Sequence, residues 1–365
     1  MKGNTIGNCG FLRRWGANAT IKLLKISGNE AKKMTEKMYD VTIVGGGPVG
    51  MFAAFYCGLH ELNAQLIEAL PTLGGQPAAL YPEKQIWDVA GKAGVTGRQL
   101  AADLAAQMAI APVDTVVGQM VTNVQKDPDG CFTITTDQAT YRAKAVLVAL
   151  GKGAFTPRPL ALPGAAELDD QQLSYFVTQK ADFAGQDVVV LGGGDSAIDM
   201  ALMLETVAKS VKLVHRRDQF RALPKMVSDL QTSAVEILTP YLPKEISSQA
   251  DGKVSLTLKK MRSEEELTLT PDRVLVNYGF TSNNAALKDW QLDLASEHHL
   301  IQVDSTMQTG VAGVYAIGDG VTYPGKVALI ANGFGEAPVA VTALAKALYP
   351  DKRLAMHSSS MKIKA

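Results

Sequence analysis

Short, mostly apolar runs alternate with longer segments of helical pattern along most of the chain. Each run has the length of a strand, and two of them lead through a glycine-rich loop into an apolar helical segment. This order predicts βαβ units and therefore an α/β fold. The clearest runs cover residues 41–44, 64–67, 145–150, 188–191, 211–214 and 274–276.

The remaining pattern predicts further elements. Residues 121–124 and 132–136 alternate around the turn Asp127-Pro128-Asp129-Gly130, which is typical of a hairpin. We expect a turn at 73–76, an alanine-rich helix at 97–111, a strand pair at 254–258 and 267–269, and a final helix from near Glu336 to about Leu348.

Two glycine-rich loops carry the dinucleotide-binding pattern. In that pattern the first glycine makes a tight turn, the second lets the backbone approach a pyrophosphate, and the third allows close helix–strand packing. The phosphates then lie at the N-terminus of the helix that follows. The residues assigned to these roles are Gly45, Gly47, Pro48 and Gly50 in the first loop, and Gly192, Gly194, Asp195, Ser196 and Ala197 in the second.

The residues after the next strand distinguish the two loops. The first unit ends at Glu68, whose carboxylate can accept hydrogen bonds from both hydroxyls of an adenine-side ribose and would repel a 2′-phosphate. The second ends at His215-Arg216-Arg217, followed by Arg221, and arginines suit a phosphate dianion. The sequence therefore predicts FAD or NAD at the first site and NADP(H) at the second.

Composition limits the alternatives. The chain has 365 residues and a formal net charge of zero, but residues 1–38 carry eight basic and two acidic residues, which leaves 28 basic and 34 acidic residues elsewhere. We expect no nucleic-acid surface and no membrane span, and we expect residues 1–38 to be a disordered extension, with folded structure from near Met38. The cysteines, Cys9, Cys57 and Cys131, form no CxxC pair or metal-ligand pattern and indicate a reduced, cytoplasmic protein.

The order of the elements predicts an insertion of one nucleotide domain into another. An FAD-binding domain would comprise residues 39–156 and 282–365, and an NADP(H)-binding domain would comprise residues 157–281. The connectors near 155–159 and 277–284 are then candidate hinges.

Both loops, together with Ile317-Gly318-Asp319, resemble those of the two-dinucleotide-binding flavoprotein superfamily. The second loop and residues 215–222 are similar to the thioredoxin reductase branch. That branch carries a redox CxxC shortly before the second loop, but here the two positions hold Phe176 and Gln179. Disulfide exchange needs two thiols, so electrons would leave the flavin directly for an external acceptor.

Within that branch, the chain resembles the thioredoxin reductase-like, or type 2, ferredoxin–NADP⁺ reductases. The resemblance implies two Rossmann-like domains, each a three-layer ββα sandwich, with the NADP domain inserted in the FAD domain. It also implies a homodimer that passes electrons between NADPH and ferredoxin or flavodoxin. The strings that carry the resemblance are 74–84, 277–280, 323–327, 333–338 and the tail 357–360.

The same resemblance assigns residues to the flavin. Tyr81 would stack on one face of the isoalloxazine, and His357 from the partner subunit would cover the other. No side chain need act as a general base, and no metal is implied, because the cofactors carry the chemistry. The further FAD contacts that it implies are Glu68, Gln76, Val121, Phe155, Asp319 and Ser360.

Two other functions stay open at this point, a disulfide reductase that uses cysteines elsewhere and a non-catalytic FAD- and NADP-binding sensor. If the partner is an acidic carrier, it needs a local basic patch, because the chain beyond residue 38 has a net charge of −6. Residues near the flavin-side strings are candidates for that patch. They are Lys84, Lys92, Arg98 and Lys326.

Overall fold

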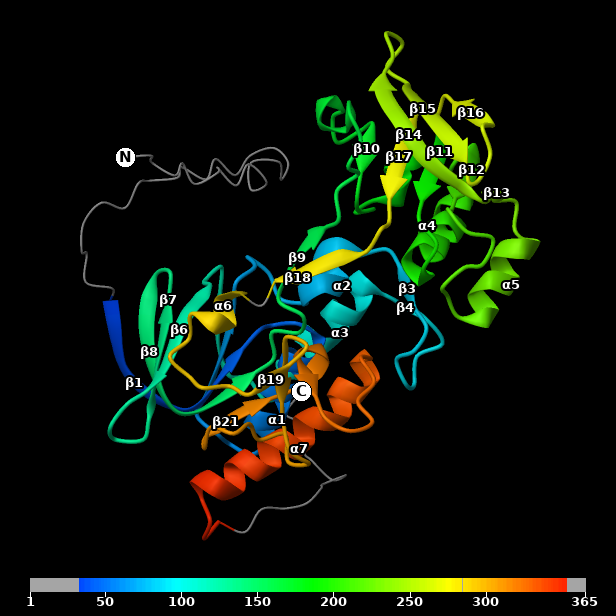
Figure 1. The fold of residues 1–365 in the computed structure, drawn as a ribbon. Coiled ribbons are helices and arrows are strands. Elements are labelled where there is room, and N and C mark those ends of the chain that lie inside the picture. The colour runs from blue at the N-terminus through cyan, green and yellow to red at the C-terminus, as the bar shows by residue number, and fades with distance from the viewer. Residues whose placement is uncertain (1–32, 284, 353–365) are drawn as a thin grey trace, which may run out of the picture. The chain divides into compact units, whose positions relative to one another are not determined.

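The computed structural model describes residues 33–283 and 285–352. Two separate sheets organise this part of the chain (Figure 1). The first sheet has the strand order β5-β2-β1-β8-β7-β6, and β21 pairs with β8. Its strands are β1 (Lys33–Val44), β2 (Ala64–Glu68), β5 (Asp114–Val117), β6 (Val121–Lys126), β7 (Phe132–Thr136), β8 (Ala139–Val148) and β21 (Val314–Ala316).

Side chains on this sheet alternate between two cores. On β8, Leu147 packs in one core with helix α1 (Pro48–Leu59) and helix α7 (Ile330–Leu348). Its neighbours Val146 and Val148 pack in the other core with Phe132 of the antiparallel hairpin β6–β7. Because successive strand residues face opposite sides, this alternation produces the predicted helix–sheet–hairpin sandwich of three layers.

The second sheet repeats the arrangement. Val190 faces the core that contains helix α4 (Asp195–Glu205) and Leu230 of α5 (Pro224–Thr232), whereas Val189 faces a three-stranded antiparallel sheet. The parallel strands are β10 (Leu173–Ser174), β17 (Arg273–Val276), β11 (Asp187–Leu191), β12 (Ser210–Val214) and β13 (Glu236–Leu238), and the antiparallel strands are β14 (Tyr241–Ser248), β15 (Val254–Lys260) and β16 (Glu266–Leu269). The predicted fold class of two Rossmann-like units, one inside the other, is confirmed.

The chain enters and leaves the second unit through a two-stranded ribbon. Strand β9 (Ala154–Pro157) pairs antiparallel with β18 (Phe280–Asn283), so that Pro157 lies opposite Phe280. The sequence predicted linkers and candidate hinges here. The backbone N–H and C=O groups of the two connectors form hydrogen bonds with each other. The connection between the two units is therefore more ordered than two separate loops would be.

Three boundaries differ from the sequence predictions. Strand β1 begins at Lys33, whereas folded structure was expected from near Met38; residues 1–32 lie outside the described part of the chain. Helix α2 (Gly75–Leu80) replaces much of the expected turn. Helix α7 begins at Ile330 rather than near Glu336, because its early glycine, Gly333, is used for close packing: a Cβ there would lie 2.3 Å from a methyl of Val49.

The remaining elements are short, apart from α3 (Gly97–Met108), which packs against α1. Within the described residues, no helix combines the length and the apolar character needed to cross a bilayer. The short elements are β3 (Gln85–Ile86), β4 (Val95–Thr96), β19 (Ser296–Glu297), β20 (Leu300–Gln302), β22 (Val321–Thr322), α6 (Ala285–Lys288) and the 3-10 turns Ala165–Glu167, Lys180–Phe183 and Gly318–Gly320.

A buried carboxylate joins the chain after α7 to the first strand. Asp40 on β1 accepts hydrogen bonds from the Tyr349 hydroxyl at 2.6 Å, from the Lys144 ammonium at 2.8 Å and from the Asn63 backbone N–H at 3.0 Å. Burial alone would raise the pKa of Asp40, but these three donors outweigh burial and lower it. A folded-state pKa below the unfolded value means that this group stabilises the protein above about pH 4, and that the contribution is lost as the pH falls.

We expect Tyr349→Phe to lower the free energy of unfolding by about 1 to 2 kcal/mol at pH 7, because it removes one hydrogen bond to a charged group. The loss should shrink when the pH is lowered to about 3, where the carboxyl is increasingly protonated. Urea denaturation at the two pH values measures both effects. Tyr56→Phe is the matched control, because the Tyr56 hydroxyl has no hydrogen-bond partner within the described residues. An equal loss in both variants would contradict the assignment.

Candidate functional site

The first glycine loop is held between the ends of two parallel strands. Gly45 has a φ of +111°, and a Cβ there would lie 2.5 Å from the carbonyl oxygen of Ala149 at the end of β8. A Cβ on Gly50 would lie 1.9 Å from the carbonyl oxygen of Gly45. Neither position can carry a side chain without moving the backbone, so the loop has the tight turn and close packing that a dinucleotide cradle needs.

Helix α1 begins directly after this loop, and no side chain of the described residues accepts a hydrogen bond from its first backbone N–H groups. Its N-cap is Gly47, no side chain caps it, Pro48 stands in the first turn, and no acidic residue lies there. The first backbone N–H groups of a helix have no partner inside the helix, and the helix dipole favours negative charge at that end. The N-terminus of α1 therefore suits a phosphate group.

Glu68 lies at the end of β2, beside the first loop. Its side chain is buried, and its two oxygens accept the backbone N–H groups of Gly46 at 2.6 Å and of Leu70 at 2.8 Å. Each carboxylate oxygen can accept a further hydrogen bond. The backbone N–H of Gln119 bonds to the Glu68 carbonyl, which places the start of β6 nearby, and the side chain of Val121 there is buried in the core.

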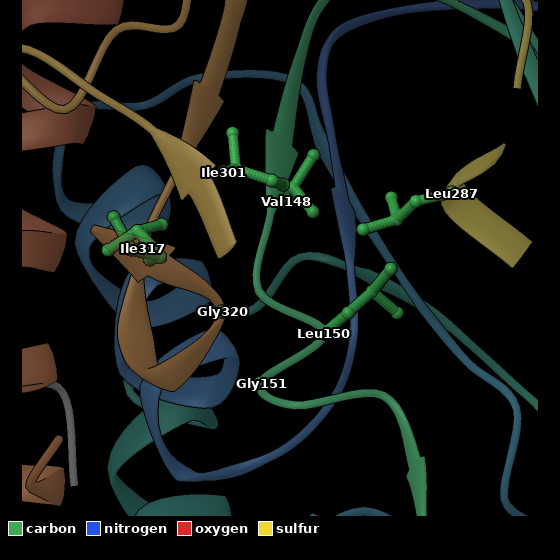
Figure 2. Close-up of a pocket in the computed structure, with 8 residues that line it drawn as sticks. Val148, Leu150, Gly151, Leu287, Ile301, Ile317 and Gly320 are labelled. Carbon is green, nitrogen blue, oxygen red and sulfur yellow. The ribbon is translucent and has the colours of Figure 1, made fainter. Parts of the chain in front are cut away.

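Three separate segments meet near the residues that the sequence resemblance assigns to the flavin. The loop after β8 and the turn after β21 meet at Gly151 and Gly320, where a Cβ on Gly320 would lie 2.5 Å from the Gly151 carbonyl oxygen. A Cβ on Gly151 would lie 3.8 Å from the side-chain amide nitrogen of Gln76, on α2. Figure 2 shows these two glycines on adjacent loops, beside an apolar hollow. The hollow is lined by Val148, Leu150, Gly151, Leu287, Ile301, Ile317, Gly320 and Val321.

The pKa values of Tyr81 and Asp319 are both shifted by burial, and the charge of Asp319 also acts on Tyr81. Burial raises the pKa of Tyr81 to about 12, with smaller contributions from the charges of Asp319 and Asp88. Burial also raises the pKa of Asp319, while Lys152 and Lys326 act in the opposite direction. The charge of Asp319 thus acts on Tyr81, although the two residues are far apart in the sequence.

Glu336 anchors the turn that carries Asp319, and the sequence analysis missed it. Its carboxylate accepts the Gly318 backbone N–H at 2.7 Å and the Tyr323 hydroxyl at 2.7 Å, and it pairs with Lys326. The Lys326 side chain is only 7% exposed, so it cannot serve the basic patch proposed from the sequence. The available signal was a lone carboxylate within the otherwise apolar run that forms α7.

The second glycine loop packs closely against the segment that follows β12. A Cβ on Gly193 would lie 2.2 Å from the His215 ring, and the backbone of Gly194 forms a bridge with that of Arg221. No side chain caps α4, and the Asp195 carboxylate in its first turn is directed instead to the Leu223 backbone N–H at 2.9 Å. Asp195 therefore orders the segment after Arg221.

The basic residues of this site are positioned around the loop. Arg216, Arg217 and Arg221 are exposed, and none of them forms an ion pair with a carboxylate in the described part of the chain. Burial lowers the pKa of His215, with a further lowering from Arg216 and Arg217, and its ring stacks on Phe220 at 5.4 Å. A neutral imidazole beside unpaired guanidinium groups leaves this surface free to bind an anion.

Ser196 and Ala197 are the remaining loop residues of the second site. Ser196 is exposed in the first turn of α4, whereas Ala197 is fully buried. A Cβ on Gly192 would lie 2.7 Å from the Ala197 methyl, so the small third residue permits the tight packing expected of it.

The other assigned residues divide into two groups. Phe155 lies in β9, where the structure describes the backbone. His357 and Ser360 lie outside the described residues. The described cysteines are Cys57, buried in α1, and Cys131, in the β6–β7 turn. Phe176 occupies the first of the two positions at which a thioredoxin reductase carries its redox cysteines. Its ring stacks on that of Phe280, with the ring centroids 5.6 Å apart, so the segment packs against β18 and carries no thiol.

Known proteins resemble the chain over nearly its whole length. A sequence profile of the pyridine nucleotide-disulphide oxidoreductase family matches residues 39–343. A ferredoxin–NADP reductase of Limosilactobacillus fermentum is 68% identical over 328 residues, which cover 90% of the chain and 99% of the relative. A protein of the same name from Limosilactobacillus reuteri is 66% identical over 330 residues, with the same two coverages. The structure of Lactococcus lactis thioredoxin reductase in its FR conformation is similar at 27% identity and a TM-score of 0.73, covering 86% of this chain and 99% of that one.

We expect Gly193→Ala to lower the free energy of unfolding by about 1 to 3 kcal/mol, because its methyl group would overlap the His215 ring. Gly194→Ala is the matched control. Its Cβ would lie 3.7 Å from the Arg221 carbonyl oxygen, an ordinary contact, and we expect a change within about 0.5 kcal/mol. Denaturant unfolding of the two variants without nucleotide measures the difference. Equal stabilities would refute the contact between Gly193 and His215.

Proposed function

Because the chain belongs to the pyridine nucleotide-disulphide oxidoreductase family, we propose that it is a flavoenzyme that moves electrons between NADPH and ferredoxin or flavodoxin. One observation carries this proposal. The two dinucleotide loops have groups of opposite charge beside them, the Glu68 carboxylate at the first and the Arg216–Arg217 pair at the second. A protein with this contrast is suited to hold two different nucleotides.

The first site fits FAD. The free N-terminus of α1 would bind the pyrophosphate, and Glu68 would accept hydrogen bonds from the ribose hydroxyls. Residues 39–156 and 282–365 would form this domain. The other residues proposed to hold FAD are Gly45, Gly47, Pro48, Gly50, Gln76, Tyr81, Val121, Phe155, Asp319 and Ser360.

The second site fits NADP(H). The unpaired arginines would bind the 2′-phosphate, and the N-terminus of α4 would bind the pyrophosphate. Residues 157–281 would form this domain. The residues proposed to hold NADP(H) are Gly192, Gly194, Asp195, Ser196, Ala197, His215, Arg216, Arg217 and Arg221.

When bound, the two cofactors supply hydride transfer and single-electron transfer. The chain would position and shield them. Tyr81, neutral at working pH, offers an aromatic ring for stacking on the flavin, and Glu336 holds the Gly318–Gly320 turn in place. In a homodimer, His357 of the partner subunit would cover the opposite flavin face. No side chain needs to transfer a proton.

The acceptor would be external, because Phe176 stands where a redox cysteine would be needed and Cys57 is fully buried. Ferredoxin or flavodoxin fits this requirement, since each accepts single electrons. Anaerobic stopped-flow mixing tests the proposal. NADPH should reduce the flavin, and the reduced protein should then reduce ferredoxin or flavodoxin with the free thiol count unchanged. Reduction of a disulfide substrate, or failure of yellow protein to oxidise NADPH with ferricyanide, would contradict it.

The arginine pair yields a specificity prediction. We expect the double variant Arg216→Ala/Arg217→Ala to raise the KM for NADPH by about 30- to 1000-fold, because each of the two lost charge-assisted contacts is worth about 1 to 2 kcal/mol. The KM for NADH should stay nearly constant. Steady-state kinetics with both nucleotides measures this, with Lys259→Ala on β15 as a control that removes a distant cation of the same unit. A parallel rise for NADH would show that the pair does not bind the 2′-phosphate.

A further inference from the structure

An ion pair connects the segment of Tyr81 to the helix of the second glycine loop. The Lys84 ammonium lies 2.5 Å from the Asp199 carboxylate, and the two side chains are 26% and 13% exposed. Lys84 follows α2, and Asp199 lies in the second turn of α4. Lys84 was a sequence-based candidate for carrier docking, but its charge is already paired with that of Asp199. Figure 1 shows α4 beside the segment that contains β3 and β4.

A second polar contact joins the same two regions. The Glu83 carboxylate accepts the backbone N–H of Lys180 at 2.6 Å. Adjacent residues 83 and 84 thus contact two separate elements of the second unit. Tyr81, three residues earlier, has its ring centroid 5.7 Å from the Lys84 ammonium. One short stretch of chain therefore carries both the proposed flavin-stacking ring and the polar contacts to the second unit.

Lys84 is the cation that faces Asp199 among several carboxylates. Burial is the main influence on the Asp199 carboxyl and raises its pKa, and the charges of Asp195 and Asp88 add to that effect. Lys84 acts in the opposite direction. Without Lys84, carboxylates from the two regions would face each other across a partly buried contact, and like charges repel. Lys84 therefore offsets this repulsion at the contact between the two regions.

The covalent connection between the two units leaves their orientation to such contacts. It consists of the ribbon β9–β18, two strands of four residues each. Hinges of this kind absorb rotation at a few residues. The side-chain contacts between the units then select among the orientations that the ribbon permits.

We propose that Lys84 and Asp199 are a domain-positioning pair, which holds the nucleotide helix α4 against the Tyr81 segment in the orientation used for hydride transfer. The inference rests on the proposed function, because it concerns how NADPH on α4 reaches the flavin. Neither side chain is assigned to a cofactor. Both act through the position of α4, so their loss changes the orientation of the units and leaves each nucleotide site intact.

Lys84→Gln tests the proposal, and Lys92→Gln is its matched control. Lys92 pairs with Asp103 at 2.7 Å, but both residues belong to the flavin-side unit. The double variant Lys84→Asp/Asp199→Lys reverses the pair and should restore it. The variants are prepared as the FAD-loaded full chain, with Cys9→Ser and Cys131→Ser to leave two added cysteines for spin labels. These labels are placed at the exposed positions Ala109 and Ala250, one in each unit.

Two readouts are needed. Pulsed electron resonance should show a broader distance distribution between the labels in Lys84→Gln and an unchanged distribution in Lys92→Gln. Stopped-flow reduction by NADPH should be about tenfold slower in Lys84→Gln, because misplacement of reacting groups by about 1 Å can cost up to 100-fold. The affinity for NADP⁺ should stay within about twofold, and the reversed pair should recover both readouts.

Unchanged distances in Lys84→Gln, an unchanged or faster reduction, or failure of the reversed pair to recover would overturn the positioning pair. The distance measurement uses no NADPH and therefore tests the positioning contact independently of the proposed function. If NADPH does not reduce the wild-type flavin, the proposed function fails, while the distances still report on Lys84 and Asp199.

Discussion

The close approach of backbone to backbone at the two glycine loops is the constraint on which both sites depend. At Gly45 and Gly50 a side chain would overlap a main-chain oxygen, and at Gly193 it would overlap an imidazole ring. These contacts fix where α1 and α4 begin. Because each helix begins uncapped, its N-terminal donors remain free for a ligand. The loops create two similar cradles, and neither cradle by itself selects a nucleotide.

In the proposed function, the choice of nucleotide comes from the polar groups that lie at the end of the next strand beside each loop. Glu68 is buried and faces the first loop, so a ligand there must present hydrogen-bond donors. Arg216 and Arg217 are exposed at the second, and their charges add to the effect of burial in lowering the pKa of the nearby His215. One fold thus provides two sites of opposite charge through a difference of a few residues at strand ends. Glu336 and Asp40 have a supporting role, since each holds segments of the first unit together through several hydrogen bonds.

Sequence patterns were sufficient where the physical cause is local. The apolar runs predicted the strands, and Val189 and Val190 pack on opposite faces as period-two residues must. The positions of the glycine loops and of Glu68 at the strand end were likewise predictable, because they depend on spacing along one βαβ unit. The start of α7 could not be predicted in this way. A glycine such as Gly333 indicates a helix boundary as long as its packing partner, Val49, is unknown. Contacts such as that of Lys84 with Asp199 depend on tertiary structure and leave no local pattern.

The structure of the FAD-loaded protein crystallised with NADP⁺ tests the central claim most directly, because it locates each nucleotide relative to the two loops. We predict the FAD pyrophosphate at the N-terminus of α1, with its ribose hydroxyls on Glu68, and the NADP⁺ 2′-phosphate between Arg216 and Arg217. A 2′-phosphate bound away from these arginines, or FAD at the second loop, would contradict the account.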